Sequence, residues 1–179
     1  SVIDTATDAV IATISDVGPE PRGLAVTNDG DDADDDETLY VTQFLSLPIA
    51  GKIDGADDAK AGHVSVVSTA TNTVVADVAV NPIADSGFKA LGNALERTAP
   101  LPATDEANFK FVTGAYPNQL NNIAIKGGYA FIPNTGASPN GPFRFDVNTQ
   151  SLLSVIDRTA RADAGQTINM HAAVKAQTN

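Results

Sequence analysis

One phrase occurs three times along this chain of 179 residues. Residues 1–7 read SVIDTAT, residues 65–71 read SVVSTAT, and residues 154–160 read SVIDRTA. Repetition inside one chain indicates a supersecondary unit that stacks against copies of itself, because a single unit cannot bury its own apolar face. The repeat therefore limits the fold to architectures that are built by stacking.

A second phrase lies between the copies of the first. Residues 21–26 read PRGLAV and lead to LYVTQ at 39–43. Residues 117–125 read PNQLNNIAI and lead to YAFIPN at 129–134. The chain thus alternates two kinds of short segment rich in Val, Ile and Thr, the residue types that favour strands.

Polar turns separate these segments and predict antiparallel hairpins. The third copy of the first phrase begins at 152–157 and is expected to continue to about residue 170. The other predicted strand pairs are 1–4 with 9–14, 23–27 with 39–43, 64–69 with 73–80, and 122–126 with 128–132.

Charge and composition exclude several classes of function. The formal net charge is −11, and such a surface repels nucleic acid and anionic lipid. The chain has no cysteine, so it forms no disulfide and offers no thiolate ligand or nucleophile. No stretch approaches the roughly 18 apolar residues of a membrane span. We therefore expect neither a nucleic-acid partner nor a membrane span.

The phrases resemble the YVTN family of β-propeller repeats. Tyr40-Val41-Thr42-Gln43 stands at the signature, with Gln where the family usually has Asn, and Phe131-Ile132-Pro133-Asn134 is a more degenerate copy. The resemblance implies an all-β fold of about two and a half four-stranded antiparallel blades. Segment 23–26 would be the innermost strand of a blade, 39–43 the next, and the SVID hairpin the outer two.

The whole chain, residues 1–179, is expected to form one propeller segment with an incomplete ring. Ser1 falls inside a repeat unit, so we expect the sequence to be truncated at its N-terminus and further blades or subunits to complete the ring. The copies are 64 and 89 residues apart, against the roughly 40–50 residues of one blade. The excess predicts insertions at about 28–37, 44–62, 81–116 and 135–151. A short helix is one possibility within the third insertion, over 86–97.

The strongest local feature is an acidic loop, residues 28–37, in which seven of ten residues are Asp or Glu. Closely spaced carboxylates beside a glycine are typical of Ca²⁺ loops, because Ca²⁺ takes six to eight oxygen ligands. The candidate metal ligands are Asp29, Asp31, Asp34, Asp35 and Glu37. The alternative is a solvated acidic loop without metal, since the spacing lacks the EF-hand pattern. A weaker acidic cluster follows at Asp54, Asp57 and Asp58.

Other polar residues have structural interpretations. Asp4 and Asp157 hold the same repeat position, where an Asp before a turn caps backbone N–H groups. His63 and His171 are isolated and make neither a metal site nor a catalytic triad. Arg144 stands between two phenylalanines in a turn-rich loop, as a ligand contact or within an ordered connection. No sequence motif assigns a catalytic or cofactor-binding residue.

The sequence favours a non-enzymatic role. We expect an extracellular or periplasmic propeller segment for protein binding, self-assembly or scaffolding, with Ca²⁺ as a candidate stabiliser. A secreted, periplasmic or cell-surface location is what the family resemblance implies. The alternative is part of a propeller hydrolase, similar to lactonases, with a divalent metal in the channel. A relative of electron-transfer propellers is a third class, although the chain has no haem-attachment motif.

Overall fold

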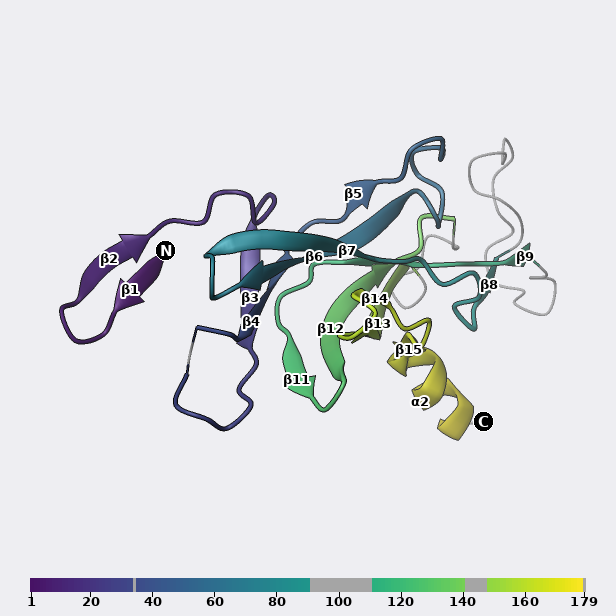
Figure 1. Cartoon of the computed structure of the whole chain (residues 1–179). Coiled ribbons are helices and arrows are strands. Elements are labelled where there is room, and N and C mark those ends of the chain that lie inside the picture. Colours follow the sequence, from purple (N-terminus) through teal and green to yellow (C-terminus); the bar gives the residue numbers. More distant parts are fainter. Residues whose placement is uncertain (34, 91–110, 141–147, 179) are drawn as a thin grey trace.

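Most of the regular structure is β-strand. The computed structural model describes residues 1–33, 35–90, 111–140 and 148–178. Its strands form a curled half-barrel, and a short helix, α2 (Met170–Thr178), lies near the C-terminal end (Figure 1). The predicted all-β class is thereby confirmed.

The first half of the chain forms sheet 1, an antiparallel meander. Its four main strands pair in the order β3, β4, β6, β7, and the short β5 pairs with the start of β6. The strands of sheet 1 are β3 (Pro21–Val26), β4 (Thr38–Gln43), β5 (Leu47–Pro48), β6 (Lys60–Ser68) and β7 (Thr73–Val80).

The second half forms sheet 2, which repeats the meander. Strands β11, β12, β13 and β14 pair in that order, while β10 pairs with the far end of β12 and β15 with β13. The strands of sheet 2 are β10 (Tyr116–Asn118), β11 (Ala124–Lys126), β12 (Tyr129–Ala137), β13 (Thr149–Asp157), β14 (Ala162–Asp163) and β15 (Ile168–Asn169).

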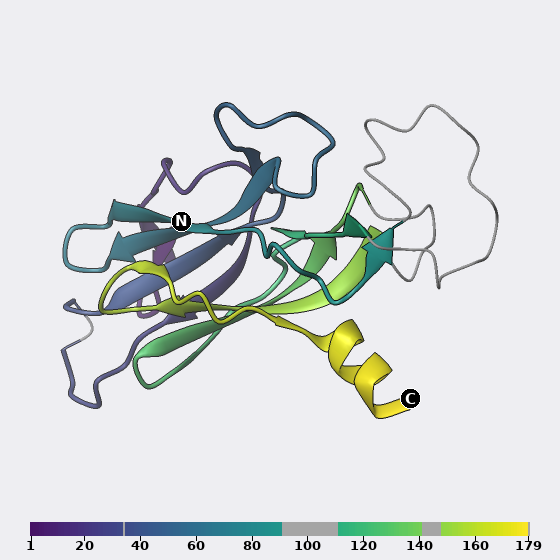
Figure 2. The same cartoon turned by 90° about the vertical axis from the view of Figure 1, so that its right-hand side faces the viewer.

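Two small hairpins complete the structure. Strands β1 (Val2–Asp4) and β2 (Ala9–Ala12) pair only with each other among the described strands, and this hairpin projects from the body, at the left of Figure 1. Strands β8 (Lys89–Ala90) and β9 (Phe111–Val112) form the other. Helix α2 lies against β13 and projects from the body, at the lower right of Figure 2.

The two sheets have the same register as well as the same strand order. We call two residues counterparts when they hold the same position in the repeated phrases. Three pairings in sheet 1 recur between counterparts in sheet 2: Ala25–Tyr40 as Ala124–Phe131, Tyr40–Val66 as Phe131–Val155, and Ser68–Thr73 as Asp157–Ala162. Because a shift of one residue would turn every side chain to the other face, this agreement means that counterparts occupy equivalent faces.

The projecting hairpin has the same internal register. It pairs Asp4 with Ala9, the counterpart of the Ser68–Thr73 pair. Its register shifts between Val2 and Ile3, which are the counterparts of the shift site in β6. The hairpin β1–β2 is therefore a third copy of the β6–β7 hairpin.

The turns repeat too. Three hairpins turn through a non-glycine residue with positive φ at the same phrase position: Asp8 (54°), Asn72 (52°) and Arg161 (49°). Two more such residues, Glu20 (51°) and Gln119 (50°), each lie three positions before a counterpart residue of the second phrase, Gly23 and Asn122 respectively. Asp4 Oδ1 accepts a bond of 2.8 Å from the N–H of Ala6, and Asp157 Oδ1 one of 2.9 Å from Ala160, as expected for capping residues.

The main core lies between the sheets. Strand β3 lies beside β11 and β7 beside β14, while β6 lies beside β10 and β7 also contacts β13. Burial of each Val, Leu or Ile side chain stabilises the fold by about 1.5–3 kcal/mol. The buried apolar side chains of this core are Tyr40, Val64, Val66, Val78, Val80, Leu120, Ile123, Ala130, Ile132 and Ile156.

One hydroxyl group connects the two sheets. Thr42 is fully buried, and its Oγ1 accepts a bond of 2.8 Å from the N–H of Gly23. The same Oγ1 donates to the carbonyl oxygen of Leu120 at 2.7 Å. Gly23 permits this close approach, since a Cβ there would lie 2.8 Å from the Cα of Asn122.

Two expectations about the insertions need correction. The strands reach into the predicted insertions, because β6 starts at Lys60, β12 runs to Ala137 and β13 starts at Thr149. The helix predicted over 86–97 is wrong for its described part, which contains strand β8. The rest of that helix lies outside the described residues.

We predict that Thr42→Val destabilises the fold by about 2–6 kcal/mol, since it leaves two buried backbone groups without a partner at about 1–3 kcal/mol each. Thr42→Ser keeps the hydroxyl and loses one methyl group, so we expect a loss of only about 1 kcal/mol. Urea unfolding of both variants measures the difference. Equal stabilities would mean that the hydroxyl does not join the sheets.

Candidate functional site

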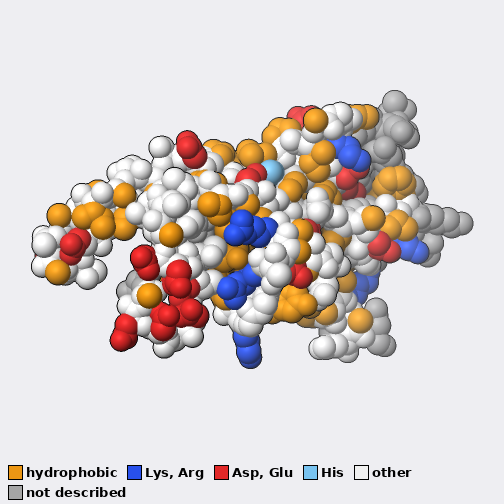
Figure 3. All heavy atoms as spheres, viewed as in Figure 1, with side chains coloured by type: hydrophobic (Ala, Val, Ile, Leu, Met, Phe, Trp, Pro, Cys, Tyr) orange, Lys and Arg blue, Asp and Glu red, His pale blue; other side chains and the backbone are white. Residues whose placement is uncertain are grey.

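The acidic loop brings three carboxylates together. One oxygen each from Asp29, Asp31 and Asp36 lies within 4.8 Å of the other two, and all three side chains are exposed. The loop forms the cluster of acidic side chains below the projecting hairpin in Figure 3. It is the only group of three or more metal-ligating side chains of this kind among the described residues.

The loop is held in shape by its own side chains. Glu37 closes it, with Oε2 accepting from the hydroxyl of Thr27 and Oε1 accepting from the N–H of Asp29 at 2.8 Å. Asn28 Oδ1 accepts from the N–H of Gly30 at 2.8 Å, and Asp31 Oδ1 accepts from Ala33 at 2.7 Å. Such turns within the loop fix the backbone but do not themselves identify a ligand.

The carboxylate cluster differs in part from the predicted ligand set. Asp29 and Asp31 belong to it, Asp35 and Glu37 do not, and Asp34 lies outside the described residues. The structure adds Asp36, which spacing alone did not single out. Glu37 instead bonds within the loop at the entrance to β4. Whether the cluster holds Ca²⁺ remains a prediction.

The pKa of Asp36 is raised in the folded loop. Loss of solvent within the loop, followed by the negative charges of Asp29 and Asp31, raises the pKa of Asp36 above its ordinary value of 3.8. A raised pKa means that the carboxylate is disfavoured in the folded loop. A bound cation or a proton would relieve the same repulsion.

A second carboxylate has a structural role that the sequence did not reveal. Asp57, from the weaker acidic cluster, is buried, with 7% of its surface exposed. Its Oδ2 accepts from the N–H of Gly114 at 2.9 Å, and its Oδ1 accepts from Asn140 at 2.7 Å. Burial raises the pKa of Asp57 above 3.8, and these N–H groups and the Ser138 hydroxyl oppose the rise. Asp57 thus ties the segment before β6 to two distant segments.

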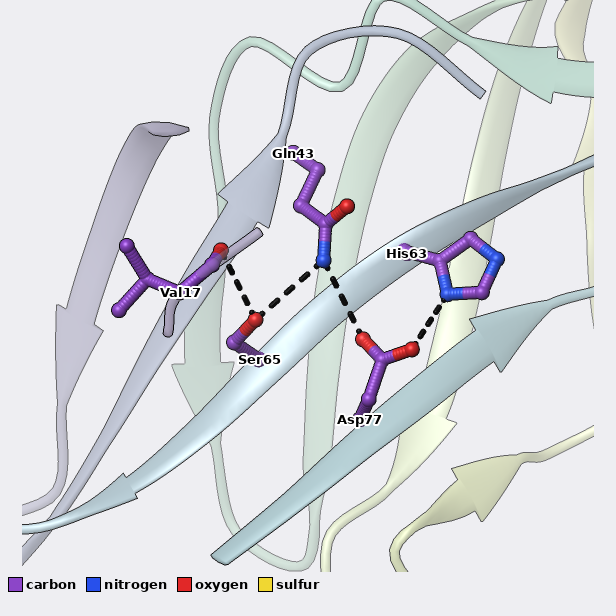
Figure 4. Close-up of polar contacts among 5 residues, drawn as sticks. All are labelled: Val17, Gln43, His63, Ser65 and Asp77. Atoms are coloured by element: carbon purple, nitrogen blue, oxygen red, sulfur yellow. Dashed lines mark hydrogen bonds and ion pairs between the residues drawn. The ribbon is translucent and has the colours of Figure 1, made fainter. Parts of the chain in front are cut away.

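A polar network fixes the connection between the projecting hairpin and sheet 1 (Figure 4). Asp77 lies at its centre, with Oδ2 at 2.6 Å from Nδ1 of His63 and Oδ1 accepting from Nε2 of Gln43 at 3.3 Å. Gln43 Nε2 also donates to the hydroxyl of Ser65 at 3.3 Å. Ser65 in turn donates to the carbonyl oxygen of Val17 at 3.0 Å.

This network is not arranged for nucleophilic catalysis. A serine nucleophile needs a base bonded directly to its hydroxyl. Here the Ser65 hydroxyl donates to a backbone carbonyl, and Gln43 stands between it and the Asp77–His63 pair. Gly18 packs against Gln43 with φ of 77°, and a Cβ there would lie 2.2 Å from the Gln43 amide. The network therefore anchors the connection.

The amide at the end of the signature has a repeated structural role. Gln43 donates to Ser65, and its counterpart Asn134 donates to Ser154, the counterpart of Ser65, at 3.0 Å. The longer Gln side chain also reaches Asp77. The signature amide therefore joins the second strand of each meander to the third.

Among the residues that the structure describes, the remaining candidates do not assemble with these groups. His171 lies in α2, away from His63 in β6. Strands β3 and β11, the predicted innermost strands, contain no Asp, Glu or His. Arg144 lies outside the described residues.

We predict that Asp57→Asn lowers the free energy of unfolding by about 1–3 kcal/mol at neutral pH, because the amide offers one acceptor oxygen to two N–H groups. Since the folded-state pKa is raised, the wild type gains stability as pH falls through that pKa toward 3.8. The gap between wild type and variant should therefore widen on acidification. Urea unfolding across pH measures it.

Asp58→Asn is the matched control. Asp58 is exposed and pairs with Lys52 at 2.5 Å, so its loss should change stability by less than about 1 kcal/mol. A gap between wild type and Asp57→Asn that is independent of pH would contradict the assignment of a raised pKa to Asp57.

Within the described residues, no helix is both long and apolar enough to cross a membrane.

Comparison with known proteins gives no relative. No protein-family model, curated protein or solved structure matches this chain significantly.

Proposed function

We propose that the chain is a β-propeller segment of the YVTN type with a non-enzymatic role in protein binding, surface assembly or scaffolding. The observation that carries the proposal is the repeated register of sheets 1 and 2. Two stacked four-stranded meanders, with the first strands β3 and β11 side by side and the last strands β7 and β14 side by side, are what successive propeller blades require.

Exposed apolar side chains support a binding role. Ile3, Val10 and Ile11 on the projecting hairpin are 55%, 61% and 62% exposed, and Leu24 and Val26 on β3 are 63% and 56% exposed. Ile11 and Val26 line one groove, and apolar side chains exposed together mark sites of protein interaction. The net charge of −11 makes nucleic acid an unfavourable partner, so we propose a protein partner or self-assembly.

The alternative is part of a propeller hydrolase with a divalent metal in the channel. Such a site needs carboxylate or imidazole ligands from the innermost strands of several blades. Strands β3 and β11 carry none, so the proposal favours binding over catalysis. Further blades would have to supply every ligand of a channel metal.

We further propose that the acidic loop binds Ca²⁺ and that the protein works outside the cytoplasm, in a secreted, periplasmic or cell-surface setting. The support is the Asp29–Asp31–Asp36 cluster, whose oxygens suit a hard cation. Millimolar affinities are usual for calcium sites of extracellular modules. The family resemblance adds the location.

Calcium should raise the melting temperature of the protein. A ligand that binds only the folded state adds about 2.7 kcal/mol to the free energy of unfolding when its concentration is 100 times its dissociation constant. For a chain of this size, that gain raises the melting temperature by about 5–10 °C. We expect Asp36→Asn to abolish most of this rise. Thermal melts in calcium and in chelator, with calorimetric titration, measure both effects.

Asp16→Asn is the control, because it makes the same charge change at an exposed site outside the loop. If calcium still raises the melting temperature of Asp36→Asn, the calcium site lies outside the loop, for example in the channel. Identical melts in calcium and chelator would leave the loop as a solvated connection.

The proposed assembly role predicts self-association that increases with concentration. The exposed apolar residues should make the sedimentation coefficient rise with protein concentration, and Leu24→Lys should reduce that rise. Val75→Lys on β7 is the matched control, since Val75 is also exposed, at 42%. A monodisperse monomer at every concentration would contradict self-assembly.

A further inference from the structure

The chain contains two Asp–Gly links, Asp29–Gly30 and Asp54–Gly55. The carboxyl group of an aspartate can react with the peptide nitrogen of the next residue. Glycine leaves that nitrogen the most accessible, because it has no Cβ and the least restricted backbone. The fold holds the two links in different ways, and this difference decides which of them can react.

The first link lies in the acidic loop, which extends away from the sheets between β3 and β4 (Figure 1). Asp29 and Gly30 are both exposed. Gly30 has φ of 95°, and a Cβ at this position would meet nothing within 4 Å. Among the described residues, no backbone-to-backbone hydrogen bond involves either residue of the link. The backbone of this link is therefore free to rotate.

Side chains of the loop bring the reacting groups together. Asp29 Oδ1 accepts from the N–H of Asp31 at 3.2 Å, a contact that folds the carboxyl group over the intervening peptide nitrogen of Gly30. The Gly30 N–H donates to Asn28 Oδ1 at 2.8 Å. Asn28 is exposed, so this bond can open without moving a strand. The Gly30 nitrogen and the Asp29 carboxyl carbon can thus meet while the chain stays folded.

The second link is held in a closed turn. The N–H of Ala56 donates to the carbonyl oxygen of Ile53 at 3.1 Å, and Gly55 is half-buried with φ of 85°. These are the features of a type II turn, in which the residue at the position of Asp54 has ψ of about +120°. Ring closure onto the Gly55 nitrogen needs a ψ of the opposite sign. The turn must therefore open before this link can react.

We propose that Asp29 is a site of spontaneous isomerisation to isoaspartate in the folded protein. The Gly30 nitrogen attacks Cγ of the protonated Asp29 carboxyl group and forms a C–N bond. The carboxyl hydroxyl and the proton of the Gly30 N–H leave together as water, and the product is a five-membered succinimide ring. Water then opens the ring: attack at the former side-chain carbonyl restores aspartate, and attack at the main-chain carbonyl gives isoaspartate. One water is lost and one is gained, and nothing is oxidised.

Isomerisation would change the acidic loop without changing its charge. In isoaspartate the backbone runs through Cβ and Cγ, so the chain gains one methylene group and the free carboxylate sits directly on Cα. We expect this carboxylate to leave the cluster in which Asp29, Asp31 and Asp36 now lie within 4.8 Å of one another. Loss of calcium binding is the consequence, and it rests on the calcium site proposed above. The covalent step itself does not depend on that site.

Ageing of the intact chain at neutral pH in chelator tests the proposal. Trypsin cuts after Lys and Arg and therefore places the two links in separate peptides, 23–52 and 53–60. Enzymatic methylation of isoaspartate, followed by mass spectrometry, measures the product in each peptide. We expect it to accumulate about tenfold faster in 23–52, because opening the backbone hydrogen bond of the second link slows that link by about this factor.

Two controls separate the effect of the fold from that of the dipeptide. In urea both links lose their structure, so their rates should become similar. Asp29→Glu keeps the charge but cannot form the five-membered ring, so isoaspartate should disappear from peptide 23–52. The proposal is overturned by equal rates in the folded chain, by an excess at Asp29 that persists in urea, or by isoaspartate that survives Asp29→Glu.

Calcium provides a separate readout. If the acidic loop binds calcium, the ion holds the Asp29 carboxylate, and saturating calcium should slow the reaction there about tenfold or more. The rate at Asp54 should not change. Selective reaction at Asp29 that calcium does not slow would support the isomerisation and contradict the calcium site, so the two proposals fail independently.

Discussion

Tyr40 and Val66 lie opposite each other on neighbouring strands and turn the same face of sheet 1 toward sheet 2. The stacking of these two apolar faces is the interaction on which the rest of the structure depends. Each meander has one face that cannot stay in water, and an equivalent meander is the surface that fits it. Apolar contact alone does not fix how the two meanders are oriented. Thr42 helps to fix that orientation, because its hydroxyl bonds to both sides of the interface.

The sequence predicted the strand pairs well, because the signals were local. Alternating β-branched residues and polar turns placed the pairs 23–27 with 39–43 and 122–126 with 128–132, and the structure confirms both. The predicted insertions were too long, since β6 and β12 extend past the repeated phrases. Where a strand ends depends on its packing against the neighbouring strand, and the sequence around the strand end does not contain that information.

The candidate site was harder to predict for the same reason. Spacing selected Glu37 as a ligand, but the backbone path of the loop turns it toward Thr27 and brings Asp36 beside Asp29. Asp57 looked like part of a second surface cluster, yet its partners are 57 and 83 residues away along the chain. No periodicity in sequence can reveal a carboxylate whose function is set by distant N–H groups.

The repeated turns have a consequence for how such a chain can change in length. Asp8, Asn72 and Arg161 share one backbone conformation although their side chains differ in size and charge. Each unit therefore sets its register by itself, through a closed turn and the strands beside it. Extra residues can enter between two paired strands, as the acidic loop does between β3 and β4, while the Ala25–Tyr40 pair keeps the register of its counterpart Ala124–Phe131. The loops between strands are thus natural places to graft foreign segments onto this scaffold.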